Sequence, residues 1–165
     1  MTSLTEAIRE KLNPKCFVHS CNKGKCSVNL DGAPAPHVII DFDKPGALLG
    51  ESETRCDYLF IADGADDVPE WVVPMELSGG RNKKSGQTLA QLQAGAKVAC
   101  KILPPNIIPK FQLVFVGSIG NSYLRKDIKK KKISFRGQSE ITEAISCGDP
   151  LTKALKITPP QKEAH

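Results

Sequence analysis

Two short apolar runs, residues 56–62 and 71–77, constrain the fold of this chain more than any other feature. The first reads Cys-Asp-Tyr-Leu-Phe-Ile-Ala and the second reads Trp-Val-Val-Pro-Met-Glu-Leu. A hairpin-like segment, residues 62–67, separates them, so the two runs are predicted to be neighbouring strands. Each run carries one carboxylate, Asp57 or Glu76, and neighbouring strands allow the two acids to converge on one hard divalent cation.

The rest of the pattern predicts an α/β fold with a mixed central β-sheet flanked by helices. Helices are expected over about 4–12, where Ser3 to Glu6 form a capping box, and over about 86–101, where Ser85 is the expected cap. The continuous apolar run 111–116 is typical of a strand buried on both faces. Further strands are expected at about 26–30, 37–43, 132–135 and 139–144, and the tail from about Pro150 is expected to fray.

The length and composition favour one globular domain over residues 1–165, because 165 residues with 40% hydrophobic and 25% charged side chains can bury a core. Its parts are a core over about 38–116, a cysteine-rich segment at 16–26 and a basic part at 121–165. No apolar run approaches the roughly 18 residues of a membrane helix, and the N-terminus lacks the apolar region of a signal peptide. A cytoplasmic protein with no membrane partner is therefore expected.

The formal net charge is +5, and cations concentrate late in the chain. This basic run consists of Arg125, Lys126, Lys129, Lys130, Lys131, Lys132 and Arg136. One interpretation is a solvated surface segment. The other is a phosphate-facing patch that binds nucleic acid, DNA or RNA, with salt-sensitive and sequence-independent affinity.

The chain has six cysteines, and without a secretion signal they are interpreted as reduced thiols rather than a disulfide framework. Cys16, His19, Cys21 and Cys26 form a cluster of four soft ligands that can hold Zn²⁺, which would make the protein a small zinc-binding adaptor. Their spacing matches no paired CxxC knuckle, so the alternative is a surface loop or hairpin.

A strand with Asp, a strand carrying Glu-x-Lys and a helix bearing Gln are the motif of the restriction-endonuclease-like, or PD-(D/E)xK, nuclease superfamily. This chain resembles that family, and in particular its small members with a CD…ELKGG…QL pattern. The matching residues are Cys56-Asp57, then Glu76 to Gly80, then Gln91-Leu92. The resemblance covers roughly residues 38–116 and implies a restriction-endonuclease-like core.

The resemblance also implies a Mg²⁺ or Mn²⁺ ion bound by the carboxylates of Asp57 and Glu76 and by the backbone carbonyl of Leu77. Gln91 would contact water or a phosphate beside it. Such an ion stabilises charge on a phosphate and lowers the pKa of an attacking water, so phosphodiester hydrolysis is the implied reaction. A homodimer is a further implication, because one site cannot cut both strands of a duplex. A further acid is expected from among Glu6, Glu10, Asp41 and Asp43.

The position of the motif lysine is occupied by Ser78, whose hydroxyl cannot supply a positive charge. Three interpretations are open. Another cation, from Arg81, Lys83 or Lys84, reaches back into the site, and these three side chains are also expected to contact nucleic acid. Alternatively, the protein is a catalytically inactive nuclease fold that keeps a binding or scaffold role. In the third interpretation, the serine is an engineered inactivating change.

Overall fold

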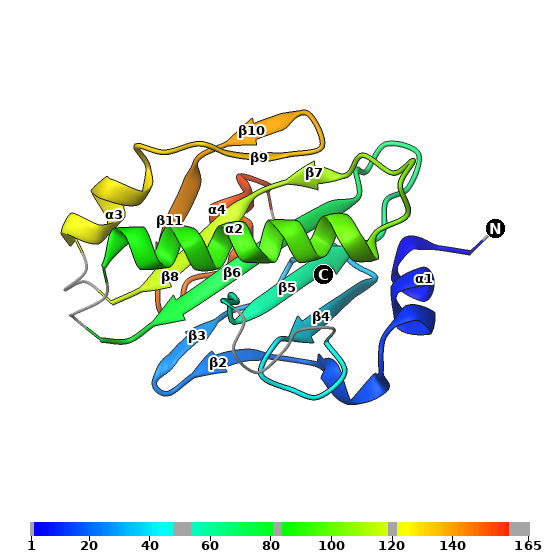
Figure 1. Cartoon of the computed structure of the whole chain (residues 1–165), viewed down its shortest axis with the longest axis horizontal. Helices are drawn as coiled ribbons and strands as arrows, with labels where there is room; N and C mark the ends of the chain where they lie inside the picture. Colours follow the sequence, from blue (N-terminus) through cyan, green and yellow to red (C-terminus); the bar gives the residue numbers. More distant parts are fainter. Residues whose placement is uncertain (1, 48–53, 81–83, 119–121, 159–165) are drawn as a thin grey trace, which may run out of the picture.

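The computed structural model describes residues 2–47, 54–80, 84–118 and 122–158. Its elements are α1 (Leu4–Lys11), a 3-10 turn η1 (Pro14–Cys16), β1 (Phe17–Val18), β2 (Cys21–Lys23), β3 (Cys26–Val28), β4 (His37–Asp41), β5 (Tyr58–Ala62), β6 (Trp71–Ser78), α2 (Ser85–Ile102), β7 (Lys110–Phe111), β8 (Leu113–Gly117), α3 (Ser122–Ile128), β9 (Ile133–Phe135), β10 (Gln138–Glu140), β11 (Thr142–Ser146) and α4 (Leu151–Leu155). The chain folds around a central sheet with helices packed on it (Figure 1). The predicted α/β class with a mixed sheet is confirmed.

The central sheet has the strand order β1-β4-β5-β6-β8-β11, and β7 also pairs with β6. Strand β5 is antiparallel to both of its neighbours, β4 and β6, whereas β8 runs parallel to both β6 and β11. Tyr58 of β5 lies opposite Met75 of β6, so the two apolar runs are neighbouring strands, as predicted. No helix within the described residues is long and apolar enough to cross a membrane.

The two faces of the sheet bury two separate cores. Val72 of β6 belongs to the core that includes Leu92 of α2, whereas Val73 belongs to the core that includes Cys21 of β2 and Leu151 of α4. Side chains alternate between the faces along a strand. The side chains of Glu76 and Ser78 therefore project toward the face covered by α2.

Helix α2 packs tightly against the sheet at Gly95. A Cβ atom added there would lie 2.5 Å from Sγ of Cys56 and 3.0 Å from Cβ of Pro74, whereas one added at Gly86 of the same helix would meet nothing within 4 Å. We expect Gly95→Ala to lower the free energy of unfolding by about 1–3 kcal/mol, because overpacking outweighs the better helix propensity of alanine. In urea denaturation the control Gly86→Ala should be neutral or stabilising by up to about 1 kcal/mol. Equal effects of the two changes would contradict this close packing.

Several local predictions hold and others are wrong. The Ser3–Glu6 capping box starts α1 as expected. At α2 the cap position is Lys84 and not the predicted Ser85, and the side chain of Lys84 makes no capping hydrogen bond. The tail does not fray directly after Pro150. Residues Leu151–Leu155 form α4, whose apolar side chains are buried in the second core.

The basic run begins within a helix that the sequence analysis did not predict. In α3, Leu124 and Ile128 lie four residues apart and are buried against Phe115 of β8, with Leu89 of α2 packed beside them. Figure 1 shows α3 next to the amino-terminal end of α2. The packing therefore places α3 at the end of the sheet where β6 and β8 finish.

Candidate active site

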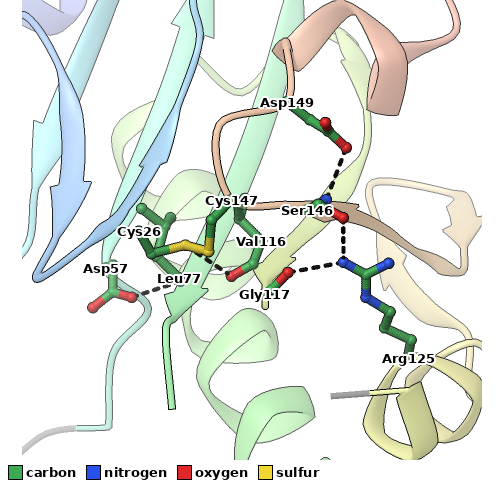
Figure 2. The surroundings of a disulfide bond; sticks show 9 residues. All are labelled: Cys26, Asp57, Leu77, Val116, Gly117, Arg125, Ser146, Cys147 and Asp149. Atoms are coloured by element: carbon green, nitrogen blue, oxygen red, sulfur yellow. Dashed lines mark hydrogen bonds between the residues drawn. A yellow bond between two sulfur atoms is a disulfide. The ribbon is translucent and has the colours of Figure 1, made fainter. Parts of the chain in front are cut away.

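Asp57 is fixed against β6 by its backbone and by its side chain. Its N–H donates to the carbonyl oxygen of Met75 at 3.1 Å, and its Oδ2 accepts the N–H of Leu77 at 2.8 Å (Figure 2). The residue is 7% exposed. The carboxylate is thus held at the start of β5 with a defined orientation toward the end of β6.

Glu76 is fully buried on the neighbouring strand, on the face that α2 covers. Burial raises the pKa of the nearby Cys56 thiol well above its ordinary value, and the negative charges of Glu76 and Asp57 raise it further. Both acids therefore lie near the Cys56 thiol, Asp57 as its neighbour in the chain and Glu76 on the paired strand. That the two carboxylates converge on one cation stays a prediction.

Leu77 directs its peptide group toward Asp57. In a strand, the N–H and C=O of one residue point toward the same neighbouring strand. Because the N–H of Leu77 donates to Asp57, its carbonyl oxygen lies on the same side of β6. The next residue, Ser78, points its peptide group the other way, where its carbonyl accepts the N–H of Ser118 at 3.3 Å.

Gln91 completes this group from α2. It lines a cavity of about 410 Å³ together with Asp57, and its Oε1 atom is buried with no hydrogen-bond partner among the residues that the structure describes. A buried amide oxygen without a partner is costly unless a ligand or water satisfies it. The Gln91 side chain, beside the cavity, thus has an unmet requirement for a hydrogen-bond donor or a cation.

The donor set is suited to a hard divalent cation. Two carboxylates, one backbone carbonyl and one amide oxygen are the ligand types that Mg²⁺ and Mn²⁺ prefer. The set contains only two acids, and within residues 2–47, 54–80, 84–118 and 122–158 no group of three or more His, Cys, Asp or Glu side chains is placed to hold a metal ion. Water and substrate oxygens would have to supply the other ligands, as Mg²⁺ sites commonly allow.

Lys23, which the sequence analysis did not consider, lies at this site. It ends β2 of the β2–β3 hairpin, lines the same cavity, and places its Nζ 2.8 Å from Oδ1 of Asp57. Partial burial lowers the pKa of Lys23, but the hydrogen bond to Asp57 and the charges of Asp57, Glu76 and Asp43 outweigh that effect and raise the pKa overall. The contact joins residues that are 34 positions apart in the chain, so no local sequence pattern predicts it.

Of the other cations proposed to reach the site, only Lys84 belongs to the residues that the structure describes. Arg81 and Lys83 lie outside the described residues. Lys84 is exposed and immediately precedes α2.

The basic run divides into internal and exposed members. Arg125 donates to the carbonyl of Gly117 and the hydroxyl of Ser146 (Figure 2), and Arg136 donates to the carbonyls that end α2 and follow it. These two guanidinium groups stabilise the fold. The exposed members are Lys126, Lys129, Lys130, Lys131 and Lys132. Because Gly117 pairs with Ser78, the hydrogen bond of Arg125 ties α3, and the lysines that follow it, to the site end of the sheet.

The cysteine-rich segment contains a disulfide. Cys26 of β3 is bonded to Cys147 after β11 (Figure 2), so the expectation that all cysteines are reduced is wrong for this pair. The expectation was based on the polar character of the N-terminal residues, whereas the fold brings these two distant segments into contact. Of the residues considered for zinc, Cys16 and Cys21 are buried thiols and His19 is exposed, while the sulfur of Cys26 is shared with Cys147.

Comparison with known proteins adds no family to this description. No protein-family model, curated protein or solved structure matches the chain. The function must therefore be inferred from the site itself.

Proposed function

We propose that this protein is a divalent-metal-dependent nuclease, built on a restriction-endonuclease-like core, that hydrolyses phosphodiester bonds in DNA or RNA. The observation that carries this proposal is the cavity beside the start of β5. Asp57 and Gln91 both line it, the amide oxygen of Gln91 is buried without a hydrogen-bond partner among the described residues, and the buried Glu76 lies on the neighbouring strand. Such a concentration of oxygen donors at one end of a sheet is expected of a cation site rather than of a packed core.

In this mechanism, the oxygens of Asp57, Glu76 and Leu77 would hold Mg²⁺ or Mn²⁺. When bound, the ion supplies positive charge for the phosphate and acidifies the attacking water. The amide of Gln91 orients a water or a phosphate oxygen in the cavity. The exposed lysines at and after α3 bind phosphates further along the strand. On a duplex, two copies of the chain would supply one site for each strand.

The direct test is cleavage of end-labelled single- and double-stranded DNA and RNA by the wild-type protein. We expect cleavage with Mg²⁺ or Mn²⁺ and none after chelation, with activity restored when the ion is returned. Binding to uncleaved nucleic acid in chelator should weaken steeply with salt, because several lysines release counterions from phosphate. An absence of cleavage with every substrate and ion would contradict the proposal.

A second candidate is a nuclease fold that binds nucleic acid without cutting it. It is favoured by Ser78 at the motif-lysine position and by the ion pair between Lys23 and Asp57, which partly neutralises the acidic pair without a metal. Salt-dependent binding without cleavage in any ion would establish this alternative.

A further inference from the structure

We propose that Lys23 supplies the positive charge that Ser78 cannot, and that it contacts the reacting phosphate in the cavity beside Asp57. This inference depends on the proposed nuclease function, and it names a catalytic residue for that function from a part of the chain outside the motif. The alternative sources considered from sequence all lie between β6 and α2 along the chain.

The position of Lys23 fits this role. Its Nζ is 2.8 Å from Oδ1 of Asp57, and its side chain is 51% exposed while that of Asp57 is 8% exposed. The ammonium group therefore lies between the buried acid and the solvent from which a nucleic acid arrives. Lysine has three N–H donors, and among the described residues only Asp57 accepts one of them. Two donors are available for phosphate oxygens.

The hairpin that carries Lys23 is held in place at the preceding residue and at its other strand. The hydroxyl of Tyr58 donates to the carbonyl of Asn22 at 2.6 Å and accepts the N–H of Asn22 at 3.2 Å. Asn22 and Lys23 are thus paired with Tyr58 and Asp57, two adjacent residues at the start of β5. On the other strand of the hairpin, Cys26 is bonded to Cys147. A side chain on such a support can keep a defined position relative to the acid.

Ser78 gives an independent way to test the assignment. Its side chain projects toward the same face of β6 as Glu76, so a lysine at position 78 would extend toward the same acids from the strand instead of from the hairpin. If the site requires one cation and Lys23 provides it, then the charge can be moved from one position to the other with recovery of function.

The experiment compares wild type with Lys23→Ala, Lys23→Arg, Lys25→Ala and the double variant Lys23→Ala/Ser78→Lys. We expect Lys23→Ala to slow cleavage by about a hundredfold or more, the usual effect of removing one preorganised charge or donor from a reacting group. Lys23→Arg should keep part of the activity, and the double variant should recover at least about tenfold over Lys23→Ala. Lys25 is exposed in the turn of the same hairpin, so Lys25→Ala is the matched control and should cleave nucleic acid at the wild-type rate.

A second measurement does not depend on cleavage. Removing the ammonium group leaves Asp57 without a competing cation, so Lys23→Ala should bind Mn²⁺ several-fold more tightly in a titration followed by electron paramagnetic resonance. A residue that only supports the fold would give weaker Mn²⁺ binding together with a lower melting temperature, and that result would overturn the inference.

The outcomes separate this inference from the proposed function. If wild type cleaves and Lys23→Ala cleaves equally well, Lys23 is not catalytic, whereas the nuclease proposal stands. If Lys23→Ala is inactive and neither Lys23→Arg nor the double variant recovers any cleavage, the charge assignment is wrong. If wild type never cleaves, both proposals are overturned.

Discussion

Glu76→Gln is expected to lower metal-dependent cleavage by about a thousandfold or more, while the protein still folds. The amide has nearly the same shape as the carboxylate, so packing between β6 and α2 is retained, but it carries no negative charge for the cation. A thousandfold loss in rate corresponds to about 4 kcal/mol of lost transition-state stabilisation, because each factor of ten in rate corresponds to about 1.4 kcal/mol. The measurements are cleavage under single-turnover conditions, Mn²⁺ affinity and thermal unfolding.

A matched control for this change lies just before the other end of the same strand. Glu70 immediately precedes β6, is half-buried, and lines a different cavity. Glu70→Gln should leave both cleavage and Mn²⁺ affinity as in wild type. If Glu76→Gln cleaves at the wild-type rate, the chemistry occurs elsewhere on the molecule.

The second large effect is expected at the disulfide. Cys147→Ser should lower the free energy of unfolding by about 2–5 kcal/mol, because the bond closes a loop across 121 residues in the unfolded chain. It should also slow cleavage. The hairpin that presents Lys23 loses its covalent attachment to the segment after β11, and the ion pair with Asp57 becomes less well defined.

The checks on this prediction are urea denaturation, cleavage and a thiol titration. Wild type, denatured without reductant, should expose four thiols and after reduction six, since the chain has six cysteines and four are free. Cys100→Ser, at an exposed free cysteine, is the control and should change neither stability nor cleavage. Six reactive thiols before reduction would show that the bond does not form.

Local sequence patterns were sufficient for the elements that frame the site. The capping box specified α1, and the apolar runs specified β5 and β6 as neighbours. Helices α3 and α4 were missed because each buries only a few apolar residues within a segment dominated by lysine or proline. Their stability comes from packing against the rest of the fold, which short helices require.

The candidate site was predictable only where its residues belong to consecutive elements. Asp57, Glu76 and Gln91 could be selected from strands and a helix that follow one another along the chain. Lys23 could not, because its contact with Asp57 depends on how the hairpin folds over the sheet. The disulfide was missed for the same reason, since Cys26 and Cys147 meet only after β11 has joined the sheet.

The parallel pairing of β11 with β8 has a consequence for how the protein is made. A nascent chain that has emerged only as far as Gly117 would present β8 with one edge unpaired, a template for association with other chains. The edge is covered only when residues 142–146 arrive from beyond α3 and the β9–β10 hairpin. Ribosome-bound intermediates between these two lengths are therefore expected to be prone to aggregation during biosynthesis.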